Sequence, residues 1–291
     1  MKGMTIERMA QACGAQVIGG QPQDRKETAA AIVTDSRQVT EGSVFVALPG
    51  ERVDGHDFIP QVFAAGALAV VCERVPQTVA GTCLVVPSSR DALRQLAACY
   101  LDELAVPVVG ITGSVGKTST KEMIASVLSQ RYRVHKTAGN FNNEIGLPLT
   151  VFGLREEHEV AVLEMGISDF GEMSRLAEIA RPNVAVITNI GICHLENLGT
   201  RDGILKAKTE VFDYLGEGAS VVLNGDDDKL CTIADVHGTK PVFYGMGEML
   251  PTEAAYEQKT IYAAAVEDHG LRGIDFDLHL PEGVYRVHVA I

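Results

Sequence analysis

Apolar runs alternate regularly with amphipathic stretches in the second half of the chain. The apolar runs have the length of buried strands and lie at 106–112, 159–164, 183–190, 219–224 and 241–244. Between them, apolar positions recur at helical spacing, which predicts helices at 118–130, 171–180, 202–215 and 226–236. Strands that alternate with helices in this way are typical of an α/β fold with a doubly wound, mostly parallel sheet.

The first part of the chain has a smaller α/β pattern. It predicts strands at 32–37, 43–48, 68–72 and 82–87, and a helix at 57–67. A helix-like run at 88–104 ends just before Pro107, so we expect two domains, residues 1–104 and residues 105–291. At the far end, 274–280 and 284–291 flank the turn PEG and predict a hairpin with no closing element after it. We therefore expect the chain to end inside a domain.

Composition limits the classes of partner. The formal net charge of −13 argues against nucleic acid or an anionic membrane as the main partner. No apolar stretch reaches the roughly 18 residues that a membrane span needs, so we expect a cytoplasmic protein. The six cysteines form no C-x-x-C pair, which favours reduced thiols over a disulfide framework or a metal site.

The clearest chemical signal follows the strand at 106–112. The sequence TGSVGKTS runs a glycine-rich turn into Lys117 and then into a helix. In such a loop the backbone N–H groups face an anion, the lysine reaches the β- and γ-phosphates, and the Thr118 hydroxyl can bind Mg²⁺. The usual pattern G-x-x-x-x-G-K-[ST] would place glycine where this chain has Ile111. The expected nucleotide contacts are Gly113, Ser114, Val115, Gly116, Lys117, Thr118 and Ser119.

The helix after this loop has a predicted apolar side. Met123, Ile124, Val127 and Leu128 recur at helical spacing. The same spacing predicts that Lys121 faces outward with its polar neighbours.

Polar residues follow three further strands at the edge where ligands of parallel sheets gather. Glu164 ends one strand, where it is either a metal-binding acid or a solvated strand end. His194 comes soon after Asn189 at the end of the next strand, and it is either a ligand or a surface histidine. Asn224 precedes three aspartates at 226–228, which either bind a ribose or base or cap the next helix.

Two other polar segments are less specific. TAGNFNNEIGLP places Asn142 and Asn143 beside glycines, which suits ligand binding but also turn formation. Lys206 and Lys208 lie two residues apart on different faces of a predicted helix. Their spacing assigns neither of them a role.

Six motifs together resemble the Mur ligases. TGSVGKTS, GNFNNEIGLP, LEMG, NIGICHLENLG, AKTEVF and LNGDDD follow one another in the order and spacing of that family. GNFNNEIGLP and the segment 35–58 are most similar to the family member that joins D-alanyl-D-alanine to UDP-N-acetylmuramoyl-tripeptide. The alternatives are the member that adds the third peptide residue and, from another class, a P-loop nucleotide-binding module or kinase. A GTPase would need an N-K-x-D motif, which the sequence does not contain.

The resemblance implies ATP-dependent amide formation through an acyl phosphate in peptidoglycan precursor synthesis. It assigns Lys117 to the γ-phosphate, Thr118 and Glu164 to one Mg²⁺, and His194 to a second Mg²⁺. It also implies that Lys208, in AKTEVF, is carbamylated, so that an anionic carbamate replaces an ammonium next to the metal.

The resemblance assigns further residues to the substrates. Asn142 and Asn143 would lie near the transferring phosphate, and Asn224 near the adenine. The region that would hold the UDP group contains Asp35, Ser36 and Arg37, and an arginine suits a diphosphate.

Family members carry a third, C-terminal domain, whereas this sequence stops at Ile291. If the chain is complete as given, we expect a monomer that binds ATP and the UDP substrate but ligates poorly.

Overall fold

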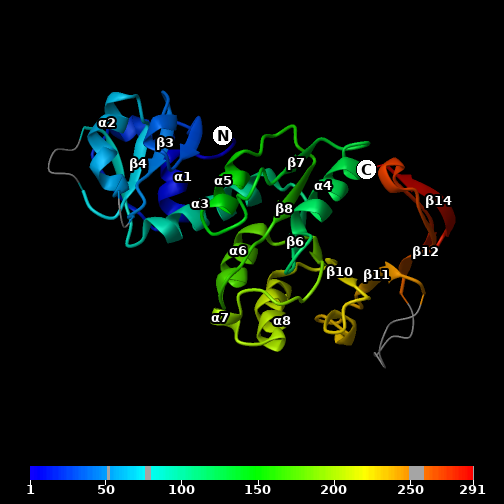
Figure 1. Ribbon diagram of the computed structural model, residues 1–291. Helices are drawn as coiled ribbons and strands as arrows, with labels where there is room; N and C mark the ends of the chain where they lie inside the picture. Colours follow the sequence, from blue (N-terminus) through cyan, green and yellow to red (C-terminus); the bar gives the residue numbers. More distant parts are fainter. Residues whose placement is uncertain (51–52, 76–79, 249–258, 291) are drawn as a thin grey trace. The chain divides into compact units, whose positions relative to one another are not determined.

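The computed structural model describes residues 1–50, 53–75, 80–248 and 259–290 (Figure 1). Contacts divide the chain into two compact units. The first contains Met1–Pro107, Leu128–Leu163 and Glu178–Ala180, and the second contains Val108–Val127, Glu164–Ala177 and Arg181–Ile291. The domain boundary at 104/105 stays a prediction.

The first unit contains a five-stranded sheet in the order β1-β5-β4-β3-β2. Its strands are β1 (Gln16–Ile18), β2 (Ala31–Val33), β3 (Ser43–Val46), β4 (Ala69–Cys72) and β5 (Thr82–Val85). Strands β2 to β5 pair in parallel, and β1 pairs antiparallel with β5. Strands β3 and β4 are buried along their whole length, which explains their continuous apolar sequence.

The same unit contains three α-helices near the N-terminus and a second group of elements. The helices are α1 (Ile6–Ala12), α2 (Ile59–Ala64) and α3 (Ser89–Leu104). The second group is β7 (Val134–Lys136), α5 (Gly146–Phe152) and β8 (Val160–Glu164), with β7 parallel to β8; the last residue of β8, Glu164, belongs to the second unit. The buried Tyr100 of α3 donates its hydroxyl to the Leu154 carbonyl at 2.7 Å, which ties α3 to this group.

The second unit is built on parallel strands that continue into an antiparallel end. Strands β6, β9, β10, β11 and β12 pair in parallel in that order, and β13 and β14 follow antiparallel. The bounds are β6 (Val108–Thr112), β9 (Val184–Ile187), β10 (Ser220–Asn224), β11 (Val242–Met246), β12 (Ile261–Asp268), β13 (Ile274–Leu280) and β14 (Gly283–Val289). The α-helices that lie wholly or mostly in this unit are α4 (Lys117–Leu128), α6 (Glu172–Ala180), α7 (Leu195–Leu198) and α8 (Arg201–Thr209). The mostly parallel α/β fold is thus confirmed, and the predicted hairpin is β13 and β14.

Two predicted helices differ from the structure. The helix expected at 202–215 ends at Thr209 and continues as the 3₁₀ turn η4 (Glu210–Tyr214). The helix expected at 226–236 is wrong, because the segment contains only the short 3₁₀ turn η5 (Leu230–Thr232). There, Asp227 accepts hydrogen bonds from the backbone N–H groups of Lys229 and Leu230, and this local pairing competes with a helix.

The predicted faces of the helix after the loop are partly wrong. Lys121 and Ala125 of α4 are buried, with exposed fractions of 1% and 2%, whereas Met123 and Val127 are 59% and 72% exposed. Lysine can be buried here because a carboxylate lies beside it, and alanine allows close packing. Ile124 and Leu128 are half-buried, so the apolar stripe indicated the buried side only in part.

All six cysteines are free thiols, as their spacing predicts. Among the residues that the structure describes, no helix combines the length and apolar character of a membrane span.

Candidate functional site

The glycine-rich segment forms a tight turn between β6 and α4. Gly113 and Gly116 have φ values of +147° and +80°, which favour glycine. A side chain at Gly113 would also collide with the Thr188 hydroxyl. The first turn of α4 has backbone N–H groups that the helix itself does not pair, so the turn and the helix start together form an anion-binding site.

The end of β9 holds this turn in place. The Thr188 hydroxyl donates to the Val115 carbonyl at 2.7 Å, and the Asn189 side chain binds both the N–H and the carbonyl of Val115, at 3.0 and 3.1 Å. The Asn189 carbonyl accepts the N–H of Ser114 at 3.0 Å. The sequence pattern places Asn189 at the end of the strand but assigns it no role in the loop, and it gives no indication that Thr188 contacts the loop. Both fix the loop before any ligand binds.

Lys117 extends back over the turn. Its Nζ donates to the Gly113 carbonyl at 2.9 Å and approaches the Ser114 carbonyl at 3.4 Å. Thr118 and Ser119 are exposed at the start of α4. The ammonium therefore lies on the loop that is expected to hold phosphate.

Glu164 meets this loop from the end of β8. The N–H of Met165 donates to the Ile111 carbonyl at 2.8 Å, which places the end of β8 beside β6. The Thr118 hydroxyl donates to Glu164 Oε2 at 3.0 Å, and Glu164 is only 2% exposed. Of the two interpretations of Glu164, the structure favours an acid directed at the loop over a solvated strand end. A hydroxyl and a carboxylate are oxygen donors of the kind that Mg²⁺ prefers.

Lys121 of α4 is a further charged group beside Glu164. Its Nζ lies 3.9 Å from Glu164 Oε2 and 3.1 Å from Glu122 Oε1. It was missed because an isolated lysine in a helix is usually solvated. The available signal was its spacing of four residues from Lys117, which places both on one side of α4.

Lys208 is buried in α8, with an exposed fraction of 1%. Burial is the main cause that lowers the pKa of its ammonium to about 8; Cys193 acts in the opposite direction, and the charge of Lys117 contributes to the lowering. Lys208 is thus within electrostatic range of the loop lysine. The Cys193 thiol donates to the Ser114 hydroxyl at 3.2 Å, so the segment before His194 contacts the loop. His194 itself is exposed at the start of α7, with a φ of +51°.

The acid-rich turn after β10 serves the protein's own structure. Asn224 donates its amide to the Thr188 carbonyl at 2.9 Å and accepts the N–H of Asp226. Asp227 accepts the N–H of Ile190 at 2.8 Å. These contacts link the ends of β9 and β10. The aspartates do not cap an α-helix, because the segment 226–236 contains only η5, and they stabilise the turn itself.

The predicted UDP-contacting residues lie in the first unit, just after β2. Asp35 caps the 3₁₀ turn η2 (Ser36–Gln38) by accepting the N–H of Arg37 at 3.0 Å. Arg37 Nη2 lies 2.6 Å from Asp35 Oδ2, and this hydrogen-bonded pairing lowers the pKa of Asp35 to about 2. The arginine is well exposed, so an anion can approach its guanidinium from solvent.

Asn142 and Asn143 also belong to the first unit, in the segment between β7 and α5. Asn143 Oδ1 accepts the N–H groups of Ile145 and Gly146, at 3.2 and 2.8 Å, and so stabilises the start of α5. The half-buried Asn142 donates its N–H to the Asn140 carbonyl at 2.8 Å. Turn formation thus accounts for part of this polar density.

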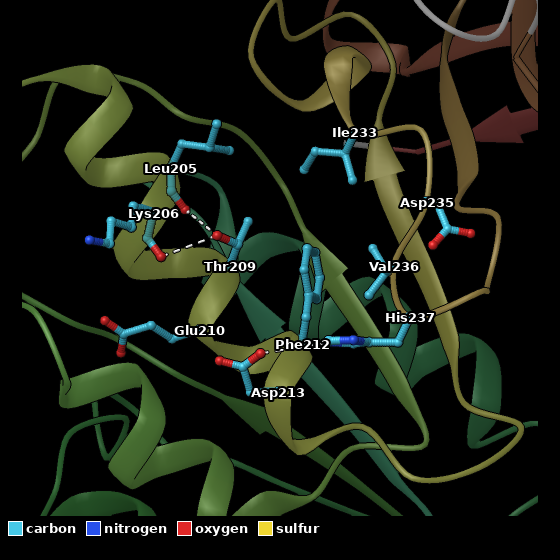
Figure 2. A pocket seen from close by; sticks show the side chains of 10 residues that line it. All are labelled: Leu205, Lys206, Thr209, Glu210, Phe212, Asp213, Ile233, Asp235, Val236 and His237. Atoms are coloured by element: carbon cyan, nitrogen blue, oxygen red, sulfur yellow. Dashed lines mark hydrogen bonds and ion pairs between the residues drawn. The ribbon is translucent and has the colours of Figure 1, made fainter.

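A cavity of about 590 Å³ lies elsewhere in the second unit (Figure 2). Figure 2 shows Phe212 and Val236 directed into it, with Asp213 and His237 at one side. Its lining residues belong to α8, η4 and the segment 233–237, and none of them is a predicted site residue. The cavity is therefore separate from the loop.

The chain is similar to known proteins along most of its length. Residues 28–108 match the model for the Mur ligase family catalytic domain, and residues 111–290 match the model for the Mur ligase middle domain. The UDP-N-acetylmuramoyl-tripeptide--D-alanyl-D-alanine ligase of Bacillus subtilis is 41% identical over 263 residues, which cover 89% of this chain and 56% of the relative.

The chain is also similar to solved structures of MurF ligases. A crystal structure of MurF from Acinetobacter baumannii has a TM-score of 0.85 and 33% identity, covering 99% of this chain and 61% of that one. The MurF ligase of Thermotoga maritima in complex with ADP has a TM-score of 0.78 and 34% identity, covering 89% and 58%. The chain thus spans somewhat more than half the length of these relatives. It belongs to the Mur ligase family.

Proposed function

We propose that the chain performs the nucleotide and UDP-substrate binding of an ATP-dependent ligase that joins D-alanyl-D-alanine to UDP-N-acetylmuramoyl-tripeptide. The observation that carries the proposal is the hydrogen bond between Thr118 and the buried Glu164, at the opening of a loop that Thr188 and Asn189 hold in place. The similarity to MurF ligases, one of them solved with ADP, supports the choice of nucleotide and substrate. We also propose residues 1–104 and 105–291 as the two domains.

Each step of the reaction uses a different property of the site. A peptide carboxylate attacks the γ-phosphoryl group and displaces ADP, which gives an acyl phosphate, and Lys117 reduces the repulsion between the two anions. The backbone N–H groups of the loop hold the triphosphate in line for this attack. Thr118 and Glu164 would hold one Mg²⁺ and His194 a second, and Mg²⁺ supplies further neutralisation of phosphate charge. The dipeptide amine then attacks the carbonyl carbon of the acyl phosphate and loses a proton, and the C–O bond to phosphate breaks so that phosphate leaves.

We also propose that Lys208, which is buried in α8, is carbamylated, as the family resemblance implies. A carbamate forms when a neutral amine adds to CO₂ and releases a proton. Because the pKa of Lys208 is about 8, about a tenth of its amine is neutral at pH 7, far more than for an exposed lysine. The carbamate would place an anionic oxygen ligand where an ammonium repels metal.

We assign the remaining predicted residues to the substrates. Arg37 would bind the UDP diphosphate, with Asp35 and Ser36 beside it. Asn142 and Asn143 would lie near the transferring phosphate, and Asn224 near the adenine.

Calorimetric titration with UDP-N-acetylmuramoyl-tripeptide tests the substrate, and titration with a non-hydrolysable ATP analogue and Mg²⁺ tests the nucleotide. We expect both to bind, with the UDP-substrate affinity reduced about tenfold or more in Arg37→Ala. Arg131→Ala, which removes an arginine beside Tyr132 elsewhere in the first unit, is the matched control. Nucleotide binding without any heat from the UDP substrate would instead favour a P-loop kinase or switch.

A further inference from the structure

Side chains with nitrogen and oxygen donors share one face of the antiparallel end of the second unit's sheet, formed by β12, β13 and β14. The strand register pairs Glu267 of β12 with Asp275 of β13, and Asp275 with His288 of β14. Residues that are directly opposite each other share a face, so these three form a row across the strands. His269 lies beside the row, in the connection between β12 and β13.

The distances within this group suit a metal ion. His269 Nε2 lies 2.9 Å from Asp275 Oδ2 and 3.9 Å from Glu267 Oε2. The donor atoms of these three residues all lie within 4.8 Å of one another. A tetrahedral ion with bonds of about 2.0 Å separates its donor atoms by roughly 3.3 Å, so small side-chain rotations are sufficient.

Neighbouring groups hold the outer oxygens of both carboxylates. His288 Nδ1 lies 2.5 Å from Asp275 Oδ1, and Arg286 Nη2 lies 2.9 Å from Glu267 Oε1. In each carboxylate the other oxygen is the one nearest His269. Metal ligands are commonly oriented by outer partners of this kind.

The register also places two carboxylates next to each other, and Arg286 and His288 offset part of their charge. Glu267 and Asp275 are directly opposite each other, and two carboxylates in that position repel. A bulge between Ala264 and Glu267 shifts the register so that this pair forms. Bulges of this type redirect side chains next to functional sites.

We propose that Glu267, His269 and Asp275 bind one divalent transition-metal ion of the Zn²⁺ class, with His288 and Arg286 as positioning residues. One imidazole and two carboxylates favour such an ion over Mg²⁺, which prefers oxygen ligands alone. The three ligands are partly exposed, so the ion can enter from solvent and keep a water as its fourth ligand. By joining β12 to β13, the ion would stabilise the end of the sheet. This site is independent of the function proposed above.

Calorimetric titration with Zn²⁺, in excess Mg²⁺ to occupy oxygen-only sites, tests the proposal. We expect one Zn²⁺ per chain and a rise in Tm of about 3 °C. His269→Ala, Asp275→Asn and Glu267→Gln should each weaken Zn²⁺ binding by about 10- to 100-fold and remove the Tm shift.

The matched control is His237→Ala. His237 is also an exposed histidine near a carboxylate, because its Nε2 lies 3.6 Å from Asp213 Oδ1. It should bind Zn²⁺ as the unaltered chain does. Unchanged ATP-analogue binding by the three cluster variants would show that they are folded. No Zn²⁺ binding by the unaltered chain, or equal binding by Asp275→Asn and Glu267→Gln, would overturn the proposal without affecting the proposed ligase.

Discussion

The hydroxyl of Thr118 donates to Glu164 Oε2 at 3.0 Å, and this contact joins the start of α4 to the end of β8. The two residues are 46 positions apart in the sequence. They meet because α4 follows β6, and the end of β6 lies beside the end of β8. In the protein without ligand, the Thr118 hydroxyl is hydrogen-bonded to the Glu164 oxygen that we expect to bind Mg²⁺. Metal binding would therefore replace a contact that is already in place.

Glu164→Gln should separate metal binding from nucleotide binding. The amide keeps the size of the side chain and its hydrogen bond to Thr118 but removes the negative charge. We expect the affinity for an ATP analogue to fall about tenfold or more with Mg²⁺ and to change little in EDTA, because only the metal needs the carboxylate. Titrations under both conditions measure this, with Glu122→Gln, the same change at an exposed carboxylate of α4, as the control. Equal losses with and without Mg²⁺ would argue against the metal role of Glu164.

Gly113→Ala should damage the loop more than Gly116→Ala. Both glycines have a positive φ, but only a side chain at Gly113 collides with Thr188, and the position of Gly116 is open. We expect Gly113→Ala to cost about 2 kcal/mol of unfolding free energy and to abolish nucleotide binding. Gly116→Ala should cost about 1 kcal/mol through strain alone. Urea unfolding and ATP-analogue titration compare the two variants, and the reverse ranking would contradict the described loop.

Lys121 should stabilise the fold through the buried Glu164 and not through the exposed Glu122. Lys121→Met leaves Glu164 buried beside one fewer cation, which we expect to cost about 3 kcal/mol. Glu122→Gln removes the exposed carboxylate 3.1 Å from the same ammonium and should cost less than about 1 kcal/mol. Urea unfolding of both variants measures the difference. Similar costs would mean that Glu164 does not depend on Lys121.

Lys208 should make stability depend on pH in a defined range. Its pKa is about 8 when folded, against a usual value of 10.5, so the unfolded chain binds more protons between these values. The free energy of unfolding therefore rises from pH 8 to pH 10.5, and the burial penalty is fully present below pH 8. In CO₂-free buffer, Lys208→Met should be more stable than the unaltered chain by up to about 3 kcal/mol at pH 7.

The difference between Lys208→Met and the unaltered chain should disappear near pH 10.5, which urea unfolding at several pH values measures. Added bicarbonate should stabilise only the unaltered chain at pH 7, since only its lysine can form a carbamate. A Met variant that is less stable at pH 7 in CO₂-free buffer would show that Lys208 carries no burial penalty.

The sequence predicted the parts of the site that depend on local pattern. The strand, glycine turn and helix around Lys117 were predictable because their spacing is short and specific. Glu164 was predictable because an acid that ends an apolar strand has few other reasons to be there. The family resemblance added Lys208, whose spacing alone assigns no role.

Other features depended on contacts between distant segments. Lys121 is buried only because Glu164 arrives from another strand, so the helical pattern placed it on the wrong face. Thr188 holds the loop through a bond to Val115, 73 residues away. The aspartates after β10 were read as the start of a helix because their pairing with distant backbone groups leaves no trace in periodicity.

A crystal structure with a non-hydrolysable ATP analogue and Mg²⁺ tests the central claim most directly. The account predicts the triphosphate over residues 113–118, and a Mg²⁺ about 2.1 Å from the Thr118 hydroxyl with Glu164 bound directly or through one water. A nucleotide bound in the cavity beside Phe212, or a metal that contacts neither Thr118 nor Glu164, would contradict it.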